Sequence, residues 1–304
     1  MSKPKFVIID GNAILHRAFH ALPQLKTREG VVVNAVYGFA SLIMKILREI
    51  EPEYIAVPFD RKEKTFRHQM YKEYKAKRPK APQELYDQIP IIKDMLHVFK
   101  IKTYEKAGFE ADDIIATLAK TKTDTKNIIL TGDKDTLQLV DDDTVVYALK
   151  GGVKDVIIYD EEKVKERYEL SPDQLVDYKA LRGDPSDNIP GVRGIGKKTA
   201  TELLKKFGTV EQLYKELVKE TLKTKDIREK TKKLLLSAKP EAFESKELVT
   251  LIDNVPVDFY LKDCKNEPLD KEKIKELFMG LGFASLVKRL EEGVKTKSIQ
   301  RKLL

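Results

Sequence analysis

Nine acidic residues in this chain fall into six short clusters, and each cluster closes an apolar run. In an open α/β sheet the carboxyl ends of parallel strands face one crevice, so acids far apart in the sequence would meet in one pocket. Carboxylates at contact distance repel one another unless some are protonated or multivalent cations lie among them. The acids are Asp10, Asp60, Glu110, Asp112, Asp113, Asp133, Asp135, Asp184 and Asp187.

Each acidic cluster also has a simpler explanation. Asp10 in IIDGN can form a turn before glycine, and an acid of GFEADD can cap the helix that follows. The pairs in TGDKD and GDPSDN can likewise cap helices or form Asx turns. Their joint occurrence favours a metal site. Because the ligands would be hard oxygens, with no cysteine or histidine set beside them, the pattern favours Mg²⁺ or Mn²⁺ over zinc.

The charge balance indicates a polyanionic partner. The 304 residues include 57 Lys and Arg against 49 Asp and Glu, a formal net charge of +8. The acids are concentrated in a few places, so the rest of the surface is more basic than the total suggests; a surface rich in Lys and Glu can also simply aid solubility. The single cysteine, Cys264, excludes an internal disulfide, and the opening MSKPKFVIID has no signal-peptide pattern. We therefore expect a cytoplasmic protein without membrane contact.

The first half of the sequence alternates strand-like and helical segments. This alternation predicts an α/β fold with a mostly parallel central sheet flanked by helices. Gly151 and Gly152 predict a turn that pairs the last two strands as a hairpin. The predicted strands cover 5–9, 53–59, 127–131, 144–149 and 155–159, and helical segments cover 34–50, 111–120 and 134–140.

From Ser171 the sequence becomes helical. We divide the chain into an α/β core at 1–170, a helical region at 171–290 and a basic tail or linker at 291–304. The glycines of GVRGIGKKTA let backbone N–H groups approach a phosphate, and two lysines open the next helix. This pattern predicts a helix-hairpin-helix at about 185–207 that grips a duplex backbone without contacting base edges. The alternative is a glycine-rich hinge.

A basic segment follows Asp60 and interleaves cations with Phe66, Tyr71 and Tyr74. Basic residues reach phosphates while aromatic faces stack on unpaired bases, a combination typical of proteins that bind single-stranded nucleic acid. The alternative is a solvated charged helix whose tyrosines lie on the core.

Taken together, these motifs resemble the 5′ nuclease (flap endonuclease) family, in particular the N-terminal 5′-3′ exonuclease domains of bacterial DNA polymerase I. The resemblance covers about residues 5 to 290 in the family's order, and every acid of the family pattern is present. A departure is Pro58, where we expect a β-branched residue. The matching segments are IIDGNAILHRAFHAL, AVYGFA, PFDRKEKTFRH with YKAKR, GFEADD, TGDKDTLQLV and ALRGDPSDNIPGVRGIGKKTA.

The resemblance implies a PIN-like core with a helical arch at about 62–95 over the active site. It implies two or more Mg²⁺ ions, with Mn²⁺ as a substitute, held or supported by all nine acids, and K⁺ at the hairpin. Arg17, Arg67 and Lys75 would approach the scissile phosphate. The DNA contacts would come from Lys72, Lys77, Arg78, Gly191, Arg193, Gly194, Gly196, Lys197 and Lys198.

The expected function is a structure-specific 5′-3′ exonuclease and flap endonuclease that hydrolyses DNA by a two-metal mechanism. It would remove flaps or RNA primers in replication and repair, acting as a monomer on flaps, nicks and free 5′ ends in the bacterial nucleoid, with a DNA polymerase in cis or in trans. One alternative is a non-catalytic DNA-binding module, which would gain nothing from a negatively charged pocket. Another is a ribonuclease, for which the long helical half has no obvious use.

Overall fold

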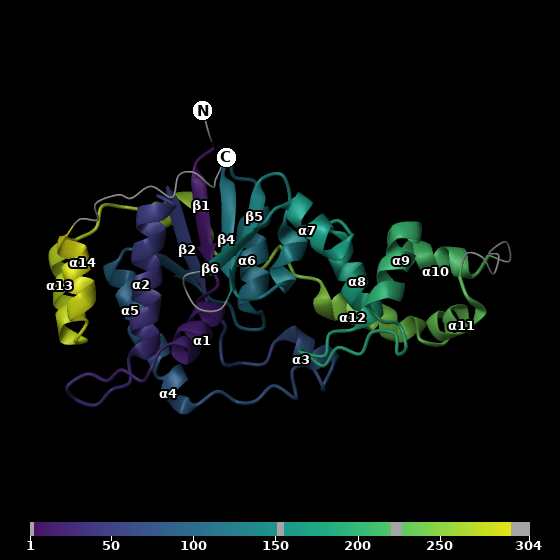
Figure 1. Cartoon of the computed structure of the whole chain (residues 1–304), viewed down its shortest axis with the longest axis horizontal. Helices are drawn as coiled ribbons and strands as arrows, with labels where there is room; N and C mark the ends of the chain where they lie inside the picture. The colour runs from purple at the N-terminus through teal and green to yellow at the C-terminus, as the bar shows by residue number, and fades with distance from the viewer. Residues whose placement is uncertain (1–2, 151–154, 220–226, 293–304) are drawn as a thin grey trace.

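A six-stranded sheet forms the centre of the computed structural model, which describes residues 3–150, 155–219 and 227–292. The strand order is β3-β2-β1-β4-β5-β6 (Figure 1). Neighbouring strands are parallel except β5 and β6, which are antiparallel, so the predicted α/β fold and terminal hairpin are confirmed. The turn predicted at Gly151 and Gly152 lies outside the described residues. The strands are Lys5–Ile9 (β1), Tyr54–Pro58 (β2), Lys102–Tyr104 (β3), Lys126–Thr131 (β4), Thr144–Lys150 (β5) and Asp155–Tyr159 (β6).

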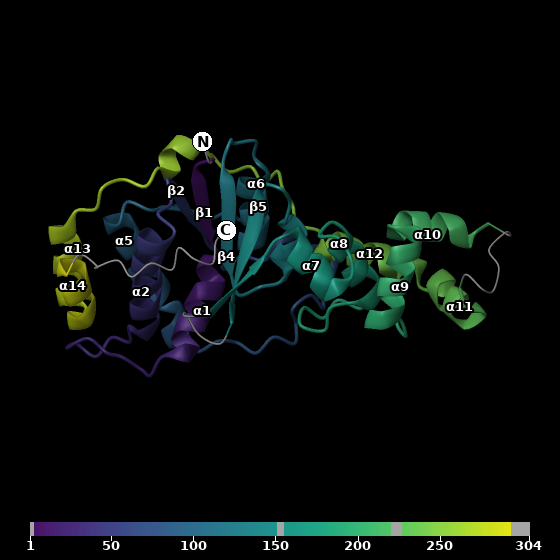
Figure 2. The same cartoon turned by 45° about the horizontal axis from the view of Figure 1, so that its top comes forward.

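Helices cover both faces of the sheet. Alternate residues of β1 pack against α1, α2 and α5 on one face, and the intervening residues pack with α6 on the other (Figure 2). A strand buried on both faces needs apolar residues throughout, which is why FVII shows no polar alternation. The helices concerned are Gly11–Ala21 (α1), Asn34–Glu49 (α2), Gln88–Val98 (α5) and Ala111–Lys120 (α6).

The edge strand β3, which pairs with β2, was not predicted from the sequence. β3 has only three residues, too few for a period-2 pattern to stand out. Pro58, the departure noted above, is the last residue of β2, and the next N–H, that of Phe59, bonds to the Tyr104 carbonyl at 2.8 Å. The missing donor of proline therefore falls at the strand terminus, where it does not interrupt the ladder.

The second half of the chain forms a separate helical lobe beyond β6. Its apolar core includes Leu181, Leu204 and Leu213, which come from three different helices. α12 lies beside α8 and leads the chain back toward the sheet (Figure 1). The helices are Glu161–Tyr168 (α7), Gln174–Arg182 (α8), Lys197–Phe207 (α9), Val210–Leu217 (α10), Glu229–Ser237 (α11) and Lys239–Val249 (α12).

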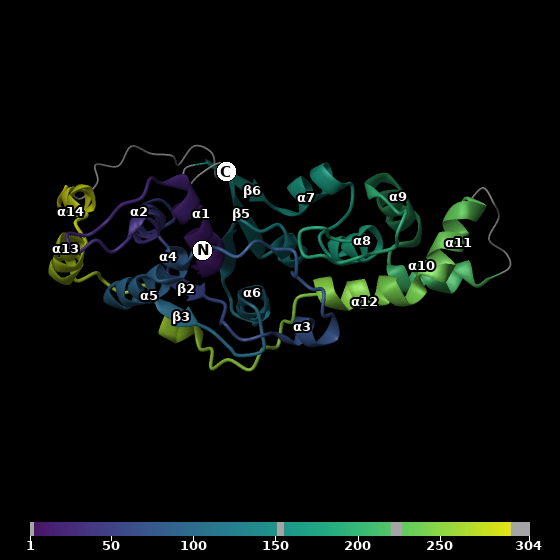
Figure 3. The ribbon, with the colours of Figure 1, turned by 90° about the horizontal axis from the view of Figure 1, so that it is seen from below.

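Residues up to 291 include further helices, but those after α12 do not pack in the helical lobe. After α12 the chain runs back across the core through a 3-10 turn at Leu261–Cys264 (η2). Helices α13 (Lys271–Gly280) and α14 (Ala284–Glu291) then pack beside α5 and α2, at the end of the molecule opposite the helical lobe (Figure 3). Phe278 and Phe283 are buried there in the core of the α/β unit. Helical periodicity indicates an apolar face but not which distant surface covers it.

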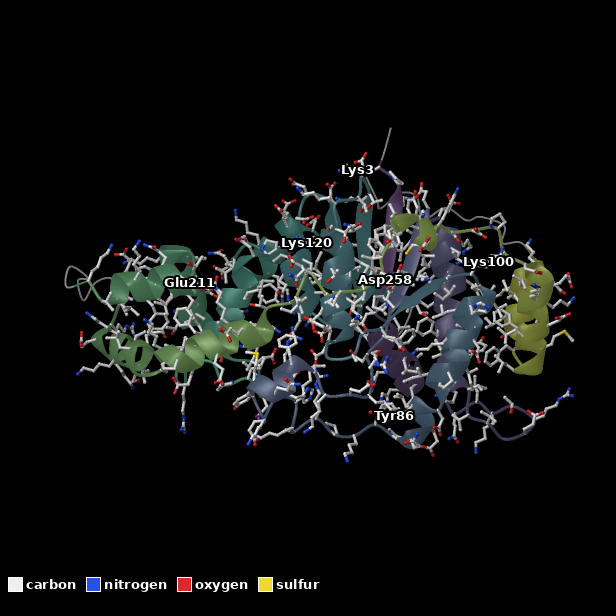
Figure 4. All side chains as sticks on the ribbon, turned by 180° about the vertical axis from the view of Figure 1, so that it is seen from behind. Lys3, Tyr86, Lys100, Lys120, Glu211 and Asp258 are labelled. Atoms are coloured by element: carbon white, nitrogen blue, oxygen red, sulfur yellow. The ribbon has the colours of Figure 1, made fainter. Side chains whose placement is uncertain are left out.

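The segment predicted as a helical arch is not one continuous helix. Within 62–95, α3 spans Phe66–Met70, residues 71–82 contain no helix, α4 spans Gln83–Tyr86, and α5 begins at Gln88. Lys75 has a φ of 54°, and two prolines follow at 79 and 82, so a continuous helix is excluded here. Figure 4 labels Lys3 beside the amino end of β1 and Tyr86 of α4 beyond the opposite, carboxyl ends of the strands.

Gly191 occupies the tightest backbone position in the helical lobe. Its φ is 59°, and a Cβ added there would lie 2.1 Å from the Gly183 nitrogen. Gly196 has a φ of −93° and open space around the corresponding position. We expect Gly191→Ala to lower the free energy of unfolding by at least about 2 kcal/mol, and Gly196→Ala by less than about 0.5 kcal/mol. Urea denaturation measures both, and equal losses would contradict this account.

Candidate active site

Three acids meet at the carboxyl ends of adjacent parallel strands. Asp10 follows β1, Asp60 lies just beyond β2, and Asp133 follows β4. Asp10 caps α1, since one carboxylate oxygen accepts from the Ala13 N–H at 2.9 Å, and the other accepts from the Thr131 hydroxyl at 2.6 Å. Strand order thus brings together residues that are more than a hundred positions apart, as the sequence predicts.

The start of α6 brings Asp112 to the same place. Asp60 accepts a hydrogen bond from the Ala111 N–H at 2.7 Å, which fixes the first turn of α6 beside β2. Asp112 then lies close enough to Asp10 and Asp133 to feel their charges. We call Asp10, Asp60, Asp112 and Asp133 the acidic cluster.

Crowding in the acidic cluster perturbs its protonation. Burial, reinforced by Asp10 and Asp133, raises the pKa of Asp112 well above its ordinary value. Burial also raises the pKa of Asp10 to about 6, partly offset by its bonds from Ala13 and Thr131. Such shifts mark buried carboxylates whose mutual repulsion exceeds the attraction of the nearby Lys75.

Arg67 is enclosed rather than directed at a substrate. Its side chain is 1% exposed and makes two 2.7 Å bonds to the carboxylate of Asp113. Its other bonds reach the carbonyls of Leu248 at 2.8 Å and Thr250 at 2.9 Å and the Glu110 carboxylate at 3.4 Å. Asp113 also accepts from the Ile252 N–H at 2.9 Å. In this structure the pair therefore joins α3, α6 and the end of α12, in place of the phosphate contact and metal ligand that we expected.

A second network ties the basic segment to the acids. Lys75 donates to Glu110 at 2.7 Å, and the Tyr74 hydroxyl donates to the same carboxylate at 3.0 Å. Asp187 pairs with Arg78 at 2.5 Å and lies 3.4 Å from the Tyr74 hydroxyl. Tyr74 is 4% exposed, so the expectation that it stacks on unpaired bases is wrong for this conformation. Its ring belongs to the small core beneath the segment.

Lys179 of α8 holds the last two acids and was not predicted. It pairs with Asp135 and, at 2.7 Å, with Asp184. Burial opposes the charge on Lys179, but the two carboxylates outweigh it and raise its pKa. Burial would raise the pKa of Asp184, but Lys179 lowers it to about 2. Burial and the charge of Asp133 raise the pKa of Asp135 to about 6. Its place in YKALRGD, five residues before Asp184, is the only sequence signal.

The acids do not converge on one point. Within residues 3–150, 155–219 and 227–292, no group of three or more carboxylates, histidines or cysteines is arranged to hold a metal ion as it stands. Lysine and arginine side chains occupy oxygens of Glu110, Asp113, Asp135, Asp184 and Asp187 instead. The four carboxylates of the acidic cluster are not among those oxygens, and hard carboxylate oxygens suit a small divalent cation.

The predicted DNA-contacting residues divide into exposed and buried ones. Gly191 is buried, and its N–H donates to the Ser245 hydroxyl at 3.0 Å, so it shapes the hairpin and cannot contact a phosphate. Arg78 pairs with Asp187 as described. The exposed residues are Lys72, Lys77, Arg78, Arg193, Gly194, Gly196, Lys197 and Lys198.

A cavity of about 950 Å³ connects the acids with the helical lobe. Its acidic side holds Asp133, Asp135 and Asp184, and Arg17 of α1 lines it next to Gly132. Its other side is formed by residues of α7 and α8 and by Lys197, the first residue of α9. The cavity therefore runs from the carboxyl ends of the strands to the hairpin.

This combination of sheet, acidic cluster and hairpin-bearing lobe defines a nuclease of the α/β type. Residues 5–169 match the family described as "5'-3' exonuclease, N-terminal resolvase-like domain", and residues 170–272 match "5'-3' exonuclease, C-terminal SAM fold". The chain therefore belongs to the 5′-3′ exonuclease family. No helix in the described ranges is long and apolar enough to cross a membrane.

Several known proteins share this sequence or fold. DNA polymerase I of Bacillus subtilis is 42% identical over 292 residues, covering 95% of this chain and 32% of that protein. DNA polymerase I of Mycobacterium tuberculosis is 39% identical over 294 residues, again covering 95% of this chain and 32% of that protein. The chain thus spans about a third of the length of these relatives.

Two solved structures show the same fold at low identity. The T5 D15 protein, co-crystallised with metal ions, superposes with a TM-score of 0.66 at 20% identity, over 95% of this chain and 97% of that one. The catalytic core of Rad2 in complex with DNA substrate superposes with a TM-score of 0.61 at 14% identity, over 95% of this chain and 91% of that one. The resemblance in fold extends across both lobes.

Loss of the Arg67 guanidinium should lower the free energy of unfolding more than loss of an exposed ion pair does. Removing one partner of a buried ion pair leaves an uncompensated charge and costs about 3–5 kcal/mol, so we expect that loss for Arg67→Met. Arg61→Met breaks an exposed pair with Glu63 and should cost less than about 1 kcal/mol. Chemical denaturation at neutral pH compares the two variants. A loss under 1 kcal/mol for Arg67→Met would leave phosphate contact as its main role.

Proposed function

We propose that this protein is a structure-specific, metal-dependent 5′ nuclease that hydrolyses phosphodiester bonds of DNA. The acidic cluster carries the proposal, because burial and neighbouring carboxylates raise the pKa of Asp10 and of Asp112 beside a cation-lined cavity, and helix capping does not require four acids in one place. Membership of the 5′-3′ exonuclease family supports the reaction. The metal ions of the T5 D15 crystals and the DNA bound to Rad2 support the cofactor and substrate classes.

Mg²⁺ is the ion we propose, with Mn²⁺ as a substitute. The ion would be held by Asp10, Asp60, Asp112 and Asp133. Asp135 and Asp184 would become ligands when Lys179 no longer pairs with them. Bound ions would activate water and stabilise charge on the attacking and leaving oxygens, as in two-metal phosphodiester hydrolysis. We further propose K⁺ at the hairpin, where turn carbonyls are the oxygen ligands that such a cation takes.

The chain's own cations would complete the site. Arg17 lines the cavity opposite the helical lobe and would bind the phosphate group, together with Lys75 at the edge of the acids. Arg67 would act indirectly, by holding Asp113 and the end of α12 in place. The exposed cations Lys72 and Lys77 would contact the 5′ strand as it leaves the site.

The hairpin would hold the duplex part of the substrate. Gly194 has a φ of 95° and Gly196 is exposed at the start of α9, so backbone N–H groups and Lys197 face solvent together. Such a surface contacts phosphates without reading bases. Flaps, nicks and free 5′ ends are therefore the substrates we propose, consistent with removal of flaps or RNA primers in replication and repair.

The cellular setting is part of the same proposal. The relatives named DNA polymerase I are about three times as long as this chain, which supports a polymerase acting in cis or in trans. We propose a monomer that works on DNA in the bacterial cytoplasm, associated with the nucleoid.

The decisive experiment incubates the protein with labelled 5′-flap, nicked, blunt-duplex and single-stranded DNA and with an RNA duplex, with and without Mg²⁺. Mg²⁺-dependent cleavage near the flap junction is the expected result. Binding without cleavage would favour a DNA-binding module, and preferential cleavage of the RNA duplex would favour a ribonuclease.

Asp112→Asn should abolish flap cleavage while DNA binding in EDTA is kept or improved, because the variant removes a metal ligand and a charge that repels phosphate. We expect single-turnover rates to fall at least about a hundredfold. Asp124→Asn is the matched control, an exposed acid at the amino ends of the strands. Normal turnover of Asp112→Asn would remove the acidic cluster from the mechanism.

The double variant Lys197→Ala/Lys198→Ala should weaken duplex binding for every sequence. Each lost phosphate contact lowers the slope of log K against log salt by about 0.9, so we expect a decrease of one to two units. Lys271→Ala/Lys273→Ala removes the same charge from α13, at the opposite end of the molecule. Anisotropy titrations at several salt concentrations measure both variants, and matching slopes would reduce the hairpin to a hinge.

A further inference from the structure

Two arginines and two tyrosines of α7 and α8 line the cavity and contact one another, and Tyr159 of β6 contacts Arg167. Arg167, at the end of α7, lies over the rings of Tyr159 at 5.7 Å and Tyr168 at 5.6 Å. Tyr168 meets Tyr178 edge to face at 6.0 Å, and Arg182 lies over Tyr178 at 5.7 Å. We call these five residues the Tyr-Arg wall.

The two arginines of the wall are positioned but not neutralised. Both residues are exposed, whereas Tyr159 and Tyr178 are each 3% exposed and therefore fixed in the core. Arg167 also donates to the Tyr159 hydroxyl at 2.6 Å. Among residues whose positions are described, neither guanidinium pairs with a carboxylate. Aromatic stacking restrains a guanidinium without consuming its charge or most of its donors.

Other cations at the cavity behave differently. Lys179 is held by Asp135 and Asp184, and Arg78 by Asp187, so their charges are already compensated. Arg167 and Arg182 line the same cavity and pair with no carboxylate of the described residues. Lys197 of the hairpin lines this cavity too. A polyanion is the ligand that such an arrangement fits.

We infer that the Tyr-Arg wall binds the sugar-phosphate backbone of DNA between the hairpin and the acidic cluster, with Arg167 and Arg182 on successive phosphates. This inference rests on the proposed function and adds a contact surface to it. Prepositioned guanidiniums bind phosphates in a bidentate manner with little loss of side-chain freedom. The wall would thereby fix the path of the strand into the cavity.

The test uses the full chain and a 5′-flap DNA in Ca²⁺, with fluorescence anisotropy from low to high salt. The double variant Arg167→Gln/Arg182→Gln should weaken binding about tenfold. It should also lower the slope of log K against log salt by about 0.9 for each of the two lost phosphate contacts. Arg289→Gln, at an exposed position of α14, is the control and should change neither. Arg182→Lys keeps the charge and should retain the slope.

A second measurement locates the contact on the DNA. Neutral methylphosphonates replace single phosphates on either side of the flap junction, one position at a time. At the phosphate that Arg182 binds, the substitution should weaken binding of the unmodified protein but add nothing to the loss in Arg182→Gln, since both remove one interaction. Additive losses at every position would overturn the assignment. Arg182→Gln alone suffices if Arg167→Gln, which loses a bond to Tyr159, fails to fold.

The outcomes separate this inference from the proposed function. If the unmodified protein cleaves the flap and the wall variants bind like Arg289→Gln, the wall is not a DNA contact and the nuclease proposal stands. If the unmodified protein neither binds nor cleaves any DNA, both fail. Weaker binding with a reduced slope, at preserved fold by circular dichroism, supports the wall.

Discussion

Repulsion among carboxylates gathered at the carboxyl ends of β1, β2 and β4 is the constraint on which the rest of this structure depends. Parallel strands bring Asp10, Asp60 and Asp133 together whatever their separation in sequence. The fold answers the accumulated charge in two ways. The amino end of α6 donates its Ala111 N–H to Asp60, and lysines and arginines pair with the outer acids. The inner four acids lie outside these pairs, and burial together with repulsion raises the pKa of Asp10 and of Asp112.

This division explains why α8 and the segment after α3 lie where they do. Lys179 bridges Asp135 and Asp184, which join the loop after β4 to the lobe. Lys75 and Tyr74 bind Glu110, and the Lys75 N–H donates to the Asp187 carbonyl at 2.9 Å. The segment after α3, which contributes little apolar surface, is thereby held against the core by charge, whereas α8 also buries Leu181 in the core of the lobe. Their positions would be sensitive to anything that competes for the acids, a metal ion first of all.

The sequence predicts the interior better than the cavity walls. Continuous apolar runs such as FVII identify buried parallel strands, and the acids that follow them identify one edge of the sheet. The partners of those acids are less predictable, because Arg67, Lys75 and Lys179 are ordinary cations whose role depends on tertiary distance. Tyr74 illustrates the same limit, since an aromatic residue among lysines suits either a base or the core. The return of α13 to α5 is equally invisible in local periodicity.

The bond between Arg67 and the carbonyls of Leu248 and Thr250 has a consequence for how the protein can be divided. A chain cut between the two matched families, near residue 170, would leave a buried guanidinium and the Asp113 carboxylate without acceptors and donors that only the later segment supplies. The α/β unit also lacks Phe278 and Phe283 if it stops there. The smallest autonomous piece therefore includes both lobes, and the family boundary is not a folding boundary.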